Sequence, residues 1–129
     1  MASPKESVKI VLVEDDTTLV EMYSVKFNQE GFDLKVATNG GQGLELAKKE
    51  LPRIVLLDVI LPGMDGFAVL KELKADAKTK HIPVLLLTNL GQDADMQKGK
   101  ALGAADYLVK ANLTPGEVVE KVRAILGGK

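Results

Sequence analysis

The 129-residue chain has no cysteine and no long apolar run. The lack of cysteine excludes disulfides, thiol chemistry and zinc–thiolate sites, and it fits a reducing cytosol. No stretch approaches the roughly 20 apolar residues that span a bilayer, and the opening MASPKES is too polar and too short for a signal peptide. We therefore expect a cytoplasmic protein with no membrane partner.

An excess of one charge is also missing, because 17 basic residues stand against 18 acidic ones and give a net charge of −1. No basic stripe predicts direct binding to nucleic acid. The length and the hydrophobic share of 46% are typical of one compact globular domain. We predict a single domain over 1–129, with its core over 8–126, a short polar N-terminal tail and a C-terminal Gly-Gly-Lys tail.

Five short apolar runs alternate with segments of helical spacing. The runs are nearly continuous, which is typical of strands buried on both faces of a parallel sheet. Alternation of this kind predicts an α/β fold with helices on both faces of the sheet and right-handed crossovers. The predicted strands are Ile10–Val13, Leu34–Ala37, Ile54–Leu57, Val84–Leu87 and Tyr107–Val109.

The helical segments show apolar residues three or four positions apart. Gly31 is expected to end the first helix, and Asp65 and Thr114 are placed to cap the third and the fifth. The fourth segment is the weakest, because Gly99 lies inside it, and we expect it to be short or mobile. The apolar positions are Leu19, Tyr23 and Phe27, then Leu44, Ala47 and Leu51, then Phe67, Leu70 and Leu73, and last Val118, Val122 and Ile125.

Polar residues follow four of the five predicted strands, at the edge where open α/β sheets bind ligands. The second strand is followed only by Thr38-Asn39-Gly40, which is typical of a turn. Each polar residue alone has a structural explanation: a turn, a backbone hydrogen bond or a solvated lysine. For Asp16 we prefer such an explanation, the cap of the first helix. The polar residues are Glu14, Asp15 and Asp16, then Asp58, Thr88 and Lys110.

Taken together, the remaining side chains form a set suited to phosphoryl chemistry. Glu14, Asp15 and Asp58 would bring three carboxylates close together, which is unfavourable unless a cation neutralises them. A site of few carboxylates that keeps several waters suits Mg²⁺. Lys110 adds a positive charge and Thr88 a hydroxyl, so a carboxylate nucleophile would face groups able to hold phosphoryl oxygens.

From KIVLVEDD to the last helix, the chain resembles a receiver domain of bacterial two-component response regulators. The motifs that carry the resemblance are the acidic pair after the first strand, DVILPGMDG after the third, Thr88 after the fourth and Lys110 after the fifth. The resemblance implies a flavodoxin-like (βα)5 fold, a doubly wound parallel sheet of five strands in the order 2-1-3-4-5 within a three-layer sandwich.

The resemblance also implies a role for each site residue. Asp58 would take a phosphoryl group from a phosphohistidine, so the protein would be a signalling phosphoacceptor and not an enzyme in the usual sense. Glu14, Asp15, Asp58 and the backbone carbonyl of Ile60 would hold Mg²⁺, the cofactor implied. Thr88 and Lys110 would contact the phosphoryl oxygens, and Tyr107 would be the aromatic residue that turns inward on activation.

Partners follow from the same resemblance. A sensor histidine kinase or phosphotransfer protein would supply the phosphoryl group, and a downstream effector would bind the surface of the fourth helix, the fifth strand and the fifth helix. GAADY and Arg123 mildly resemble receivers that dimerise through this surface, so a homodimer on phosphorylation is included among the expectations.

Two residues depart from the family pattern. Ala111 follows Lys110 where relatives commonly have proline and a cis bond; a cis bond without proline costs about 3–4 kcal/mol, so we expect trans. Asn89 stands where a small residue usually follows the threonine, and we hypothesise that its side chain slows access of water or donor to the site.

Three alternative functions can be compared with the residues of this sequence. A phosphohydrolase of the haloacid dehalogenase type needs a second acid two residues after its nucleophile, where this chain has Ile60. A flavodoxin-type cofactor binder needs a phosphate loop after the first strand, but the acidic loop here would repel phosphate. The third is a pseudo-receiver, a module that binds proteins independently of phosphorylation, and it remains the alternative.

Overall fold

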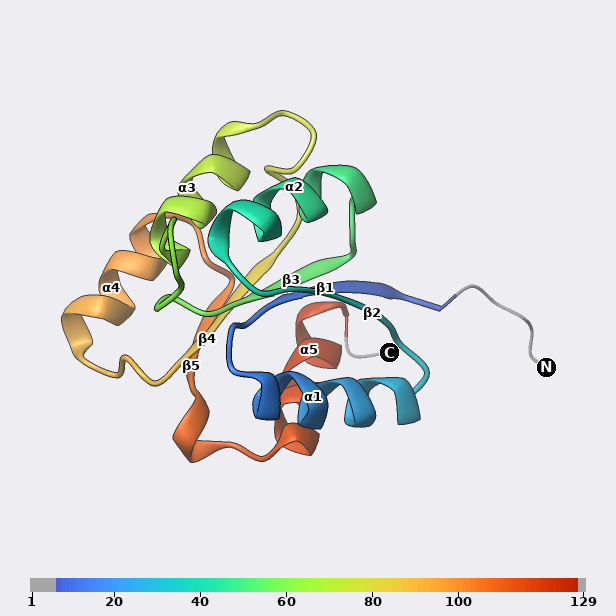
Figure 1. Ribbon diagram of the computed structural model, residues 1–129. Helices are drawn as coiled ribbons and strands as arrows, with labels where there is room; N and C mark the ends of the chain where they lie inside the picture. Colours follow the sequence, from blue (N-terminus) through green and yellow to red (C-terminus); the bar gives the residue numbers. More distant parts are fainter. Residues whose placement is uncertain (1–6, 128–129) are drawn as a thin grey trace.

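The computed structural model describes residues 7–127 and contains a five-stranded sheet in the order β2-β1-β3-β4-β5, with every neighbouring pair parallel (Figure 1). The predicted fold class and strand order are thus confirmed. The elements are β1 (Lys9–Val13), α1 (Thr17–Gln29), β2 (Asp33–Ala37), α2 (Gly40–Glu50), β3 (Ile54–Leu57), α3 (Gly66–Ala75), β4 (Val84–Thr88), α4 (Asp93–Ala101), β5 (Asp106–Val109), a 3₁₀ turn η1 (Lys110–Asn112) and α5 (Pro115–Ile125).

The helices cover the sheet on both sides and form two cores (Figure 1). Successive side chains of a strand point to opposite faces, so alternate residues of β1, β3 and β4 enter different cores. One core packs Val11, Val55 and Leu86 against α2, α3 and α4. The other packs Leu12 and Leu56 against α1 and α5. This burial on both faces explains why the central strands read as continuous apolar runs.

Helix ends follow the sequence signals. Asp16 caps α1 by accepting the N–H groups of Thr18 and Leu19, as expected. Asp65 caps α3, and Thr114 forms a complete capping box with Glu117 at α5. The segment after β2 is more than a turn, because the Asn39 side chain caps α2.

Three details differ from the sequence expectations. Leu51 does not extend the buried face of α2: it lies after the helix with φ 46° and is 51% exposed. β2 is only half-buried because it is an edge strand, whereas the prediction treated every strand as fully covered. α4 is short, at nine residues, yet Gly99 supports its packing, since a Cβ there would lie 2.7 Å from Leu86 Cδ1.

The strand register places the predicted site at one edge of the sheet. Val13 pairs with Leu57, and Leu57 pairs with Leu86, so β1, β3 and β4 end side by side. Thr88 pairs with Val109, the residue before Lys110. Within the described residues, no helix is long and apolar enough to cross a membrane.

Candidate functional site

An acidic cluster lies at the carboxyl ends of β1 and β3. Carboxylate oxygens of Glu14, Asp15 and Asp58 all lie within 4.8 Å of one another. Glu14 and Asp58 are 1% and 6% exposed, whereas Asp15 is exposed. Two buried carboxylates this close repel each other strongly unless positive charge is supplied. The cluster is therefore a site built for cations.

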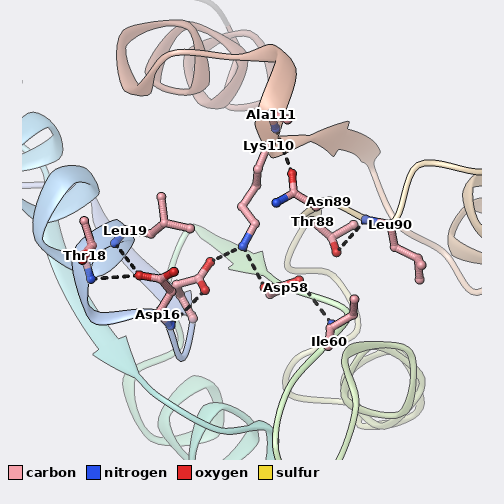
Figure 2. Close-up of polar contacts among 11 residues, drawn as sticks. Asp16, Thr18, Leu19, Asp58, Ile60, Thr88, Asn89, Leu90, Lys110 and Ala111 are labelled. Carbon is pink, nitrogen blue, oxygen red and sulfur yellow. Dashed lines mark hydrogen bonds and ion pairs between the residues drawn. The ribbon is translucent and has the colours of Figure 1, made fainter.

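Lys110 supplies one positive charge from the other side of the sheet edge. Its ammonium lies 2.8 Å from Glu14 Oε1 and 2.9 Å from Asp58 Oδ2. Figure 2 shows the side chain reaching from the turn after β5 towards Asp58. Only 9% of the Lys110 side chain is exposed, so the ion pairs are poorly screened by solvent. Lys110 is thus joined to Asp58, 52 positions earlier in the sequence, and to Glu14, 96 positions earlier.

The hydrogen bonds of Asp58 hold its carboxylate in a fixed position. Oδ1 accepts the N–H of Ile60 at 3.2 Å, and Oδ2 takes the Lys110 ammonium (Figure 2). The backbone then turns sharply back, so that a Cβ on Gly66 would lie 2.2 Å from the carbonyl oxygen of Asp58. Only glycine at position 66 permits this close approach, which explains the glycine that opens α3.

Burial and neighbouring groups shift the pKa values of Glu14 and Lys110. Burial raises the pKa of the Glu14 carboxyl, and hydrogen bonds from Lys110 and from the Asp16 N–H offset only part of this effect. Burial alone would lower the pKa of Lys110, but its hydrogen bonds to Glu14 and Asp58 outweigh burial and the pKa is raised. Lys110 is therefore a firm cation at neutral pH.

The donor set of the cluster fits Mg²⁺. Carboxylate oxygens are the hard ligands that Mg²⁺ prefers, and an exposed Asp15 leaves room for the waters that the ion retains. Ile60, the predicted backbone ligand, follows Asp58 closely enough for their hydrogen bond. Ile60 as a residue is 60% exposed, so this part of the loop lies at the surface.

The end of β4 and the loop after it are held by hydrogen bonds at Thr88 and Leu90. The buried Thr88 hydroxyl accepts the Leu90 N–H at 3.3 Å, which leaves its own proton free for another acceptor. The carbonyl of Leu90 accepts the Tyr107 hydroxyl. The Tyr107 ring is 8% exposed, and burial raises the pKa of its phenol. Tyr107 thus faces inward against the loop that carries Thr88.

A contact that the sequence did not predict joins the two residues departing from the family pattern. The side-chain oxygen of Asn89 accepts the N–H of Ala111 at 2.9 Å (Figure 2). The Lys110–Ala111 bond is trans, as are all peptide bonds in the described residues. The sequence signal that could have indicated this contact is that both departures lie at the ends of neighbouring strands.

Comparison with known proteins identifies the family. Residues 10–123 match the family described as the response regulator receiver domain. The chain is 35% identical to protein PilH of Pseudomonas aeruginosa over 120 residues, covering 93% of this chain and 98% of PilH. The chain belongs to the response regulator receiver domain family, and it is accordingly a receiver domain of two-component signalling.

Other relatives are longer, and several solved structures share the fold. The response regulator PleD of Caulobacter vibrioides is 41% identical over 81% of this chain, but the chain covers only 23% of PleD. RpaA of Synechocystis, a DNA-binding transcriptional regulator, is 38% identical and covered over 48% of its length. The chemotaxis protein CheY4 of Vibrio cholerae superimposes with a TM-score of 0.86 at 28% identity, covering 93% of this chain and 99% of CheY4.

Proposed function

We propose that this receiver takes a phosphoryl group on Asp58 and thereby changes the surface formed by α4, β5 and α5. The observation that supports this function best is the Asp58 carboxylate, held at the sheet edge between the Lys110 ammonium and two further carboxylates. A nucleophile in such a position needs a donor of phosphoryl groups and a counter-cation, and little else from the protein.

An Asp58 carboxylate oxygen attacks phosphorus, and the P–N bond of the donor phosphohistidine breaks. The bond's electron pair stays on the imidazole nitrogen, which takes up a proton from solvent. Lys110 is placed to offset charge on the phosphoryl oxygens, and the free hydroxyl proton of Thr88 can be donated to one of them.

Glu14, Asp15, Asp58 and the Ile60 carbonyl would hold Mg²⁺. When bound, the ion would neutralise the carboxylates and the developing phosphoryl charge. The chain's own contribution is to keep Lys110 charged, to hold Asp58 in place and to exclude water around the buried Glu14.

The switch would run through the loop after β4. If Thr88 moves towards a phosphoryl oxygen, its bond with the Leu90 N–H must change, and Leu90 also accepts the Tyr107 hydroxyl. Phosphorylation of Asp58 would in this way alter Tyr107 and the neighbouring α4. Such a two-state element, biased by a local charge, is how a modification acts at a distant surface.

Partners would meet the domain at two places. A sensor histidine kinase or phosphotransfer protein would present its phosphohistidine at the sheet edge, and a downstream effector would read the α4–β5–α5 surface. A solved complex of CheX, CheY, BeF₃ and Mg²⁺ from Borrelia burgdorferi contains a protein with the same fold, at a TM-score of 0.84 and 25% identity. A homodimer stays a prediction; the two charges that suggested it are engaged within the chain, Arg123 with Glu30 and Glu120, and Asp106 with the Tyr107 N–H.

Incubation with Mg²⁺ and acetyl phosphate tests the proposal. The expected result is one phosphoryl adduct by intact-mass spectrometry, lost on removal of Mg²⁺ with a chelator and lost in Asp58→Asn. Asp76→Asn is a matched control, because Asp76 lies after α3, away from the sheet edge that carries the site, and should keep the adduct.

The same experiment decides against the pseudo-receiver. A domain that acts only as a protein-binding module would give no adduct with acetyl phosphate or with any phosphohistidine donor. That outcome would contradict the proposal. The complete set of Asp58, Thr88 and Lys110 around one edge favours the phosphoacceptor.

A further inference from the structure

We propose that Asn89 is a positioning residue for Lys110: by accepting the Ala111 N–H, it holds the turn from which Lys110 reaches the carboxylates. The inference rests on the proposed phosphoacceptor function. It assigns a purpose to the two residues that depart from the family pattern, and it treats them as one unit.

The backbone turn that begins at Lys110 has an N–H group, that of Ala111, whose acceptor lies outside the turn. Residues Lys110–Asn112 form a single 3₁₀ turn, closed by the Leu113 N–H on the Lys110 carbonyl at 3.2 Å. The first N–H groups of any helix lack partners within the helix. Val109, the residue at the N-cap, has an apolar side chain and cannot supply one. The Ala111 N–H therefore finds its acceptor outside the turn, and in this structure the acceptor is the exposed side chain of Asn89 at 2.9 Å.

Position 111 is alanine and not proline. A proline at position 111 would have no N–H to donate, and it would disfavour the helical backbone of the residue before it, which is Lys110. The structure instead has Lys110 inside the 3₁₀ turn with a trans bond to Ala111. Asn89 and Ala111 together thus fix this turn by a side-chain hydrogen bond in place of a ring.

Asn89 connects the two segments that carry Thr88 and Lys110. It directly follows Thr88 at the end of β4, and Figure 2 shows its amide oxygen directed at Ala111. Its hydrogen bond connects the loop after β4 with the turn after β5, 22 residues later. Both loops supply a group for the phosphoryl oxygens, Thr88 and Lys110, so the bond keeps those two groups in register.

Asn89→Ala removes the acceptor, and two readouts follow the result. With acetyl phosphate and Mg²⁺, phosphorylation of Asp58 should become about three- to tenfold slower, the range expected for one lost hydrogen bond. The amide proton of Ala111 should exchange with solvent faster by a similar factor, measured by NMR. Gln92→Ala is the matched control; Gln92 is an exposed amide of the same loop whose side chain makes no cap bond with the described residues, and its loss should change neither readout.

A double-mutant cycle separates positioning from general damage. In Ala111→Pro the donor is gone, so adding Asn89→Ala should change the phosphorylation rate by less than about twofold. Circular dichroism establishes that Ala111→Pro is folded, and the Ala111 exchange rate in Asn89→Ala tests the bond without that variant.

Five outcomes would overturn the inference. Faster phosphorylation in Asn89→Ala would mean that the side chain instead restricts access to Asp58. Unchanged phosphorylation, or unchanged exchange at Ala111, would show that the bond does not position Lys110. An equal slowing in the wild-type and the Ala111→Pro backgrounds would show that Asn89 acts by another route. If the wild type takes no phosphoryl group at all, the proposed function fails and the inference fails with it.

Discussion

Lys110 is the residue on which the electrostatics of the site depend. It is the cation that bridges the buried Glu14 and Asp58, at 2.8 and 2.9 Å. One ammonium facing three carboxylates leaves a net negative site, which favours a divalent cation. In the proposed function Lys110 would therefore have two opposed effects: it would help a phosphoryl group to bind and it would compete with the metal.

Lys110→Met should separate these effects, because methionine keeps most of the apolar stem and removes the charge. We expect phosphorylation by acetyl phosphate to slow by roughly 10²-fold, the usual cost of losing one placed charge at a reacting group. Mg²⁺ binding, measured by isothermal titration calorimetry, should become tighter, because a repelling charge is gone. Lys100→Met, at an exposed lysine of α4, should change neither value. Weaker Mg²⁺ binding in Lys110→Met would contradict this account.

At this scale the sequence predicted residue types and positions better than contacts. Glu14, Asp58, Thr88 and Lys110 could be found because each lies at the end of a strand or directly after it, and parallel strands end at one edge. The bond between Asn89 and Ala111 could not, because no local rule links a strand-end amide to a backbone N–H 22 residues later. Leu51 was misassigned because helical spacing says nothing about where a helix ends.

Among the elements, α4 packs closely on Tyr107, the predicted switch residue. Gly99 is buried, and a Cβ there would lie 2.7 Å from Leu86 Cδ1 and 3.1 Å from Tyr107 Cδ2. The sequence predicted a short or mobile helix at this glycine, because glycine lowers helix propensity. The structure gives it the opposite role, since it lets α4 approach the sheet and Tyr107.

Gly99→Ala should therefore destabilise the protein. Better helix propensity contributes about 1 kcal/mol, but overpacking a filled core costs about 1–3 kcal/mol. The net loss should be about 1 kcal/mol in urea unfolding. Gly41→Ala, in the first turn of α2, is the control; its Cβ would meet only Asn39 Oδ1 at 3.7 Å, and the variant should be at least as stable as the wild type. Equal stabilisation by both substitutions would show that close packing is not the reason for Gly99.

Helices α1 and α5 are joined by an ion pair. Glu30, at the end of α1, accepts Arg123 of α5 at 2.7 Å and Lys26 at 3.3 Å. These hydrogen bonds, from Arg123 first and Lys26 second, hold the pKa of the Glu30 carboxyl below its ordinary value. The unfolded chain therefore binds a proton at Glu30 more readily than the folded chain does, and stability from this group rises with pH.

Glu30→Gln should lose this contribution. At neutral pH the variant should unfold at a lower urea concentration than the wild type, and the difference should close as the pH falls through the lowered folded-state pKa of Glu30, until the carboxyl is protonated in both states. Glu45→Gln is the control at an exposed residue of α2 and should follow the wild type at each pH. A difference between Glu30→Gln and the wild type that is constant with pH would contradict the charge explanation.

For the molecule as a whole, the sheet separates stability from chemistry. Two apolar cores on opposite faces hold the sheet, and the polar residues with predicted chemical roles gather along one edge of it. The alternating pattern of strands and helices predicted this division, because apolar runs on both faces of a parallel sheet leave only its ends for polar groups. Periodicity alone did not indicate that β2 is half-buried; only the strand order implied by the resemblance places this strand at an edge.

The most direct test of the central claim is to identify the residue that carries the phosphoryl group. After incubation with Mg²⁺ and acetyl phosphate, borohydride reduces an aspartyl phosphate to homoserine, which peptide mass spectrometry can locate. We predict homoserine at position 58 and none at Asp15 or Asp16. Homoserine at another aspartate, or none in a protein shown to be folded, would contradict the account.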